Sequence, residues 1–185
     1  MDEIWIQKVL HGDSEAFRQI ISKYKDMAYS IAMSVIKDEF YTKEILQVSF
    51  LKAYDKLDTF KGDSKFSTWF YRIVINESFK YVKKHKTEFV DFVETPPEIS
   101  DEIENAILKL ELDDQKYYIT EALKKIAPKE SLILRLFYLD ENSIEEIRSI
   151  TGWSSSNIKV ILHRARINLK HILTEIYKLD KKVFY

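Results

Sequence analysis

The sequence contains no cysteine, and its 185 residues include only three glycines and three prolines. The absence of cysteine excludes disulfide bonds, thiolate metal sites and cysteine nucleophiles. So few helix-breaking residues, beside many Leu, Ile, Lys and Glu residues, predict an all-α protein. No apolar run approaches the roughly 20 residues of a membrane-spanning helix, and the first residues lack a signal-peptide pattern. We therefore expect a cytoplasmic protein with no direct membrane insertion.

The sequence also lacks the short motifs that carry common catalytic chemistry. It has no glycine-rich phosphate loop, no HExxH motif and no nucleophile elbow. The four histidines are scattered, and the spacing between His163 and His171 is poor for two metal ligands on one helix. We predict no enzymatic activity, no cofactor and no metal site.

The net charge is only −1, but positive and negative residues are concentrated in different stretches of the chain. Residues 61–86 contain seven Lys or Arg against two acids, whereas residues 87–115 contain ten Asp or Glu against one Lys. The only adjacent prolines, Pro96 and Pro97, lie in the acidic stretch. These features predict two helical domains, residues 1–86 and 115–185, joined by an acidic linker at residues 87–114.

Residues 154–176 have the pattern of one helix with two distinct faces. Apolar residues recur at helical spacing along one face: Ile158, Ile161, Leu162, Ala165, Leu169, Ile172, Leu173 and Ile176. The other face carries cationic and small side chains: Ser156, Lys159, Val160, His163, Arg166 and Lys170, with Arg164 on the shoulder. Residues 155–171 include four Lys or Arg and no acid. Such a helix suits a nucleic-acid groove.

A shorter predicted helix precedes this one. Ser143 and Glu146 have the spacing of a capping box. Gly152 can adopt the left-handed conformation that ends a helix, and Ser154 can cap the helix that follows. Two helices joined by a tight glycine turn predict a helix-turn-helix. An ordinary helical hairpin with a solvated basic face is the alternative.

A predicted helix at residues 41–57 shows two stripes. Its apolar face comprises Leu46, Phe50, Ala53, Tyr54 and Leu57. The second stripe mixes polar and apolar side chains: Glu44, Gln47, Val48, Leu51 and Asp55. This mixture suits either a docking surface or an ordinary exposed face.

A polar loop at residues 58–65 precedes a long predicted helix that starts at Phe66. Arg72, Asn76 and Lys83 share one side of this helix. Aromatic residues interleaved with cations suit single-stranded nucleic acid, because bases stack on rings and phosphates meet cations. Phe66 and Trp69 fit either a base-stacking position or the core.

Ordered stretches along the whole chain carry a more specific signal. Residues 12–17 read GDSEAF, residues 44–54 read EILQVSFLKAY and residues 60–76 read FKGDSKFSTWFYRIVIN. Near the end come PKE at 128–130, EI at 146–147 and LHRARINL at 162–169. This ordered set resembles bacterial RNA polymerase sigma factors of the extracytoplasmic-function (ECF) class. The stretch at 60–76 is similar to the family's most specific signature almost residue for residue.

The resemblance implies a protein that directs promoter recognition. The first domain would dock on the clamp helices of the polymerase beta-prime subunit and capture unstacked bases of the minus-ten element. The second domain would read the minus-thirty-five element of promoter DNA as duplex, and the beta flap is a further expected contact on the polymerase. The acidic linker would thread the polymerase's RNA path, and an anti-sigma factor is an expected partner.

The helix faces and the resemblance together predict three sets of site residues. The polymerase-binding set comprises Glu44, Gln47, Val48 and Leu51. The melted-strand set comprises Lys61, Ser64, Lys65, Phe66, Trp69, Arg72, Asn76, Lys80 and Lys83. The duplex set comprises Ser155, Ser156, Lys159, Val160, His163, Arg164, Arg166 and Lys170. Two rival functions are a helix-turn-helix regulator with an N-terminal helical sensor domain and a helical interaction protein with no DNA role.

Overall fold

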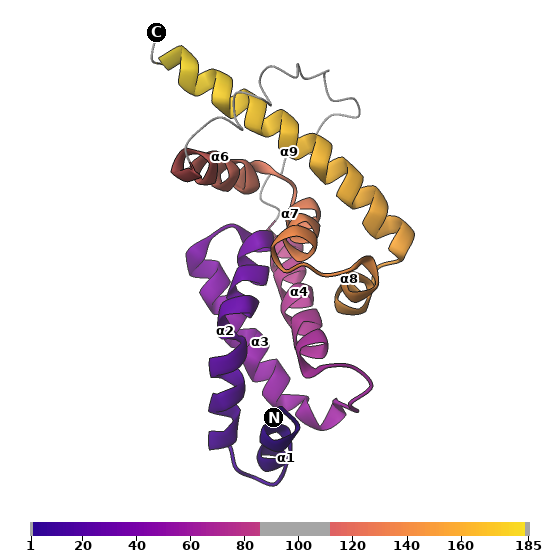
Figure 1. The fold of residues 1–185 in the computed structure, drawn as a ribbon. Helices are drawn as coiled ribbons and strands as arrows, with labels where there is room; N and C mark the ends of the chain where they lie inside the picture. Colours follow the sequence, from indigo (N-terminus) through magenta and orange to yellow (C-terminus); the bar gives the residue numbers. More distant parts are fainter. Residues whose placement is uncertain (1, 86–111, 184–185) are drawn as a thin grey trace. The chain divides into compact units, whose positions relative to one another are not determined.

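The computed structural model describes residues 2–85 and 112–183, and every regular element in these two stretches is a helix (Figure 1). The predicted all-α class is thus confirmed. The described residues form two compact units, one of residues 2–85 with 145–153 and one of residues 112–144 with 154–183. None of the described helices is both long enough and apolar enough to cross a membrane.

The predicted linker at residues 87–114 lies mostly outside the described residues. Its last three residues belong to a helix, because α6 (Leu112–Lys125) starts inside the predicted linker. Residues 145–153, which we predicted within the second domain, are grouped with the N-terminal unit. The domain bounds 1–86 and 115–185 stay a prediction.

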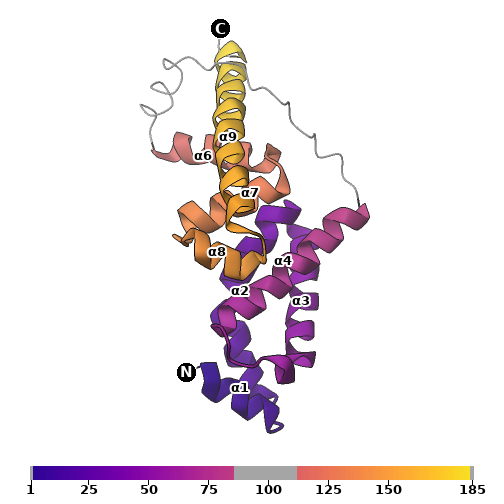
Figure 2. The same cartoon turned by 90° about the vertical axis from the view of Figure 1, so that its right-hand side faces the viewer.

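The first unit is built around a central helix. Its first elements in chain order are α1 (Asp2–Leu10), α2 (Glu15–Ile36), α3 (Glu39–Asp55), η1 (Leu57–Thr59) and α4 (Phe66–His85). Helix α2 packs against α1, α3 and α4, and α3 also packs against α4 (Figure 2). Large side chains fill the space between these helices: Ile20, Ile31, Val35, Leu57, Phe70 and Ile75.

Acidic side chains set the starts of α2 and α3. At the start of α2, the Asp13 side chain accepts a hydrogen bond from the Ala16 amide (3.3 Å), whereas the Ser14 side chain makes no capping bond. Asp38 caps α3 by accepting from the Tyr41 amide (3.0 Å). Helix α3 therefore begins at Glu39, two residues before the predicted start.

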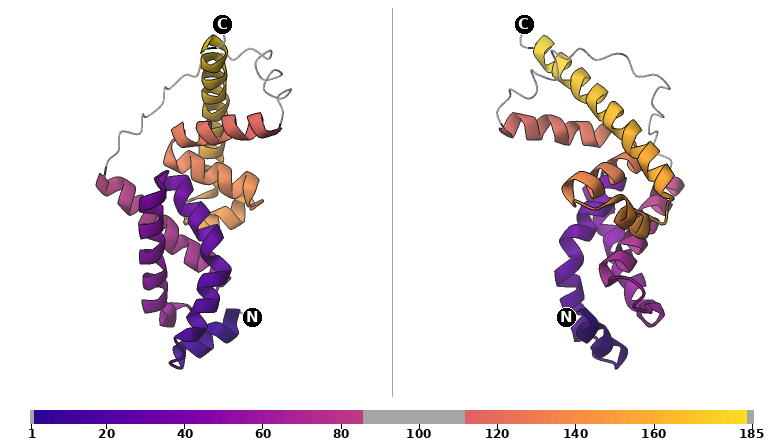
Figure 3. Two further views of the ribbon diagram at one scale, coloured as in Figure 1. Left: turned by 90° about the vertical axis from the view of Figure 1, so that its left-hand side faces the viewer. Right: turned by 45° about the vertical axis from the view of Figure 1, so that its right-hand side comes forward.

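The second unit contains α6, α7 (Pro128–Leu134), a π-helical turn η2 (Arg135–Leu139) and α9 (Ser155–Val183). The long helix α9 packs across α6 and α7 (Figure 3). Pro128 lies in the first turn of α7, where its missing amide proton costs nothing. The apolar stripe predicted for α9 faces inward: Ile158, Leu162, Ala165, Ile172 and Ile176 are buried, and Ile161, Leu169 and Leu173 are half-buried.

Helix α8 (Ile144–Thr151) is followed by a three-residue turn, residues 152–154, and then by α9. Gly152 has φ +75°, and its amide donates to the Arg148 carbonyl oxygen at 2.8 Å. The Ser154 hydroxyl accepts from the Asn157 amide at 3.3 Å. These two observations confirm the predicted glycine stop and serine cap.

Candidate polymerase and DNA interfaces

Helix α3 exposes the whole stripe that we predicted to bind polymerase. Glu44, Gln47, Val48 and Leu51 all have exposed side chains, and Leu51 is 65% exposed. The opposite side of α3 is buried at Thr42, Ser49, Phe50 and Ala53. An exposed leucine beside exposed polar groups on one helix face forms a surface that a partner can cover.

One residue that we assigned to the buried apolar face of this helix is exposed to solvent. Tyr54, predicted in the core, is 42% exposed. Its ring packs edge-on against Phe17 at 5.1 Å between centroids. Tyr54 therefore extends the exposed surface of α3 by one turn.

The loop before α4 and one side of α4 expose the polar residues of the melted-strand set. The exposed members are Lys61, Ser64, Lys65, Arg72, Asn76, Lys80 and Lys83. Lys80 forms an ion pair with Glu77 at 3.4 Å, and Arg72 donates to the Ser149 carbonyl oxygen of the same unit at 2.5 Å. Within the described part of the chain, Lys61 and Lys65 have no acidic partner. These two lysines are available to phosphates.

The aromatic members of this set have different surroundings. Phe66 is 3% exposed and stacks against Phe70 at 6.0 Å between centroids, so the core alternative is correct for Phe66 and its ring cannot stack on a base. Trp69 is half-buried and lies 5.5 Å from Phe60, which is also half-buried. Phe60, which opens the 60–76 stretch, was not among the predicted site residues.

The cationic face of α9 is exposed along its first three turns. The exposed members of the duplex set are Ser156, Lys159, Val160, His163, Arg164 and Arg166, whereas Ser155 and Lys170 are half-buried. Lys159, His163 and Arg164 have no acidic partner among the described residues. Because residues 155–171 contain no acid, this face attracts anions such as a DNA backbone.

Arg166 is held by two aromatic residues, Phe137 and Tyr138, that were not among the predicted site residues. Its Nε donates to the Tyr138 hydroxyl at 2.7 Å. The guanidinium carbon lies 5.6 Å from the ring centroid of Tyr138 and 5.7 Å from that of Phe137. No local sequence pattern links side chains 28 positions apart, so only the structure could reveal this contact.

Comparison with known proteins decides between the functions that these surfaces allow. Residues 20–88 match the family described as Sigma-70 region 2, and residues 116–169 match Sigma-70, region 4. The chain is also 29% identical to the ECF RNA polymerase sigma factor SigW of Bacillus subtilis over 182 residues, covering 92% of this chain and 96% of SigW. The chain belongs to the ECF sigma factors.

A further relative agrees with this assignment, and a solved structure shares the fold. The sigma factor is 28% identical to the ECF RNA polymerase sigma-E factor of Escherichia coli K12 over 177 residues, which covers 89% of this chain and 90% of that protein. Its fold resembles that of the sigma factor RpoE of Bartonella quintana, with a TM-score of 0.62 and 23% identity over 85% of this chain and 96% of that one. The RpoE likeness concerns the fold alone.

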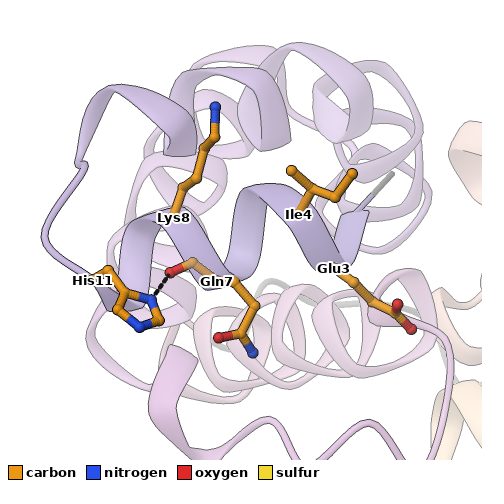
Figure 4. Close-up of a pocket in the computed structure, with 5 residues that line it drawn as sticks. All are labelled: Glu3, Ile4, Gln7, Lys8 and His11. Carbon is orange, nitrogen blue, oxygen red and sulfur yellow. Dashed lines mark hydrogen bonds between the residues drawn. The ribbon is translucent and has the colours of Figure 1, made fainter.

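The sigma factor also has a shallow hollow on α1. It is lined by Glu3, Ile4, Gln7, Lys8 and His11 (Figure 4). The His11 Nδ1 atom lies 2.7 Å from the Gln7 carbonyl oxygen. None of these residues belongs to a predicted site.

Residues 2–85 and 112–183 contain no group of three or more His, Asp or Glu side chains that could hold a metal.

Proposed function

We propose that this sigma factor uses three separate surfaces to bind core RNA polymerase, open promoter DNA and read promoter duplex. The observation that carries the proposal is the half-buried Trp69 beside Phe60, next to a loop with exposed Lys61 and Lys65, which have no acidic partner among the described residues. A duplex-reading regulator has no need for a surface that stacks unpaired bases. The match of residues 20–88 to Sigma-70 region 2 disfavours that alternative as well.

The exposed stripe of α3 is the proposed polymerase contact. Leu51 and Val48 supply apolar area, while Glu44 and Gln47 supply hydrogen-bonding groups around it. The partner is the pair of clamp helices of the beta-prime subunit. A helical surface suits this partner because side chains four residues apart along α3 lie on one face.

The 61–65 loop and the exposed side of α4 are the proposed contact for the melted strand. Trp69 and Phe60 offer ring faces to an unstacked base of the minus-ten element, and Lys61 and Lys65 meet the flanking phosphates. Asn76 and Lys83 extend the polar track along α4. Phe66 supports the site from the core, without touching DNA.

The exposed face of α9 is the proposed contact for the minus-thirty-five duplex. The N-terminal turns of a recognition helix meet base edges, and later turns leave along the backbone. Ser155, Ser156, Lys159 and Val160 therefore read the sequence, together with His163. Arg164, Arg166 and Lys170 bind phosphates. The region that contains α9 also contacts the beta flap.

The remaining partners follow from family likeness. The acidic linker at residues 87–114 occupies the RNA path of the polymerase, where its carboxylates imitate nucleic acid. An anti-sigma factor is a further partner, since the RpoE structure is a complex with the anti-sigma factor NepR. The chain itself catalyses no reaction and lends promoter specificity to the polymerase.

Transcription in vitro with core polymerase, with and without this protein, tests the proposal on promoter fragments. We expect transcripts that depend on the protein and co-elution of the protein with core polymerase in gel filtration. Tight sequence-specific binding to duplex fragments as a dimer, with no effect on polymerase, would instead support the regulator alternative.

A further inference from the structure

The segment before α8 places an exposed tyrosine beside the cationic face of α9. The π-helical turn η2 ends with the Asp140 amide donating to the Arg135 carbonyl oxygen at 3.1 Å. The Arg135 and Asp140 side chains also form an ion pair at 3.3 Å. Asn142 then donates twice to the Leu136 carbonyl oxygen, each time at 3.0 Å. These bonds fix the backbone around Tyr138, whose side chain is 52% exposed.

Tyr138 and Arg166 have donors left over after they bond to each other. The Arg166 Nε–H donates to the Tyr138 oxygen at 2.7 Å, which leaves the four N–H groups of the two terminal nitrogens. The tyrosine oxygen accepts this bond, so its own proton stays available as a donor. Within the described part of the chain, Arg166 has no acidic partner. Several donors thus converge with one positive charge.

The ligand that fits these donors is a phosphate group. A guanidinium presents its N–H groups in a planar fork that matches phosphate oxygens. The rings of Phe137 and Tyr138 lie 5.7 and 5.6 Å from the guanidinium carbon and hold it in place before any ligand binds. Lys159, His163 and Lys170 lie on the same side of α9 as Arg166, at helical spacing, and no acid interrupts residues 155–171. The surroundings therefore favour an anion.

We propose that Tyr138 and Arg166 together bind one backbone phosphate of the minus-thirty-five duplex, with Tyr138 donating its hydroxyl proton and positioning the guanidinium. This inference rests on the proposed function of α9 as the duplex-reading helix. It adds a residue from η2 to the DNA interface, outside the helix-turn-helix. The contact carries no base specificity, because a phosphate is the same at every position.

Methylphosphonate scanning of a promoter duplex tests the proposal with full-length protein bound to core polymerase. Each backbone position receives one neutral methylphosphonate, and the affinity of the holoenzyme is measured. For wild type, we expect one position near the minus-thirty-five element at which neutralisation weakens binding about tenfold, the size expected for a charge-assisted hydrogen bond. Tyr138→Phe and Arg166→Ala should each abolish sensitivity at that same position and weaken binding to the unmodified duplex.

Double substitution separates a shared phosphate from two independent effects. Tyr138→Phe with Arg166→Ala should bind no more weakly than Arg166→Ala alone, and Arg166→Ala should lower the salt slope by about 1. Leu139→Ala, at an exposed neighbour, should leave the scan unchanged. Additive losses, or a Tyr138→Phe scan identical to that of wild type, would overturn the inference while leaving the sigma function intact. A wild-type holoenzyme that ignores the minus-thirty-five duplex would overturn the proposed function of α9 and the phosphate contact with it.

Discussion

Lys52 on α3 and Glu77 on α4 form an ion pair, with 2.5 Å between Lys52 Nζ and Glu77 Oε2. The Glu77 side chain is only 13% exposed and also pairs with Lys80 at 3.4 Å. Helix α3 carries the proposed polymerase contact, and α4 carries the proposed contact for the melted strand. The ion pair therefore links the two helices that carry these two proposed contacts.

We predict that Glu77→Gln lowers the free energy of unfolding by about 1–2 kcal/mol near neutral pH, between the values for exposed pairs and for charged hydrogen bonds. Burial alone would raise the pKa of Glu77, but hydrogen bonds and charge from Lys52 and Lys80 lower the pKa below its ordinary value of 4.5. A lowered pKa adds stability above pH 4.5 that is lost as the pH falls through the folded-state pKa. Urea unfolding at several pH values measures this difference, which should shrink below pH 4.5.

Glu39→Gln is the matched control, because the Glu39–Lys43 pair spans one turn of α3 and both side chains are more than 60% exposed. It should change stability by less than about 0.5 kcal/mol. A Glu77→Gln penalty that stays constant down to the acid transition would contradict the assigned role of the carboxylate.

The second prediction concerns polymerase docking. Glu44→Arg combined with Gln47→Ala should weaken binding to core polymerase. Adding Leu51→Arg should weaken the binding free energy by about a further 2 kcal/mol, the size expected for a central interface residue. Circular dichroism should show unchanged helicity, because all three side chains are exposed. Arg18→Glu, on the exposed surface of α2, serves as the control for a charge change elsewhere. Undiminished pull-down of core enzyme by the triple variant would reject the docking assignment.

The third prediction separates two aromatic residues that the sequence could not distinguish. Phe66→Ala should lower the free energy of unfolding by about 3–5 kcal/mol, because it empties a core position. Trp69→Ala should cost less stability and should instead slow promoter opening, as the loss of base stacking is worth about 1–3 kcal/mol. Thermal melting and the fluorescence of a base analogue in the minus-ten element measure the two effects. Normal opening by Trp69→Ala holoenzyme would remove Trp69 from the DNA contact.

The sequence was sufficient for features that depend on local chemistry. Apolar spacing predicted the buried stripe of α9, and the turn at Gly152 and the cap at Ser154 followed from their conformational and hydrogen-bonding preferences. At the start of α2, Asp13 and Ser14 are adjacent and either side chain can accept an amide proton, so the sequence alone does not choose between them. The structure shows that Asp13 accepts the bond.

The features that the sequence could not provide depend on contacts between distant elements. Phe66 and Trp69 are both aromatic and three positions apart, yet only Phe66 lies against Phe70 in the core. Tyr138 lies in a π-helical turn and contacts Arg166, 28 positions along the chain, and no spacing in the sequence predicts either feature.

The fourth prediction distinguishes residues of α9 that read bases from residues that bind phosphates. Lys159→Ala should relax one position of the minus-thirty-five element, at about 1–3 kcal/mol, because Lys159 lies in the early turns that meet base edges. Lys170→Ala should weaken all promoters alike and lower the salt slope by about 1. Sequencing of transcripts from a promoter library measures the sequence preference, and the same measurement at several salt concentrations gives the salt slope. If Lys159→Ala abolishes binding to every site with unchanged preference, Lys159 is an anchor and the division is wrong.

Under the proposed function, this protein gives core polymerase its promoter specificity through both DNA contacts. Run-off transcription from a library randomised at the minus-ten and minus-thirty-five elements, with core polymerase and full-length protein, tests it most directly. We predict that transcripts require the protein and that the selected promoters share sequences at both elements with a fixed spacing between them. Transcription that is equally strong without the protein, or selection at a single duplex site, would contradict the proposed function.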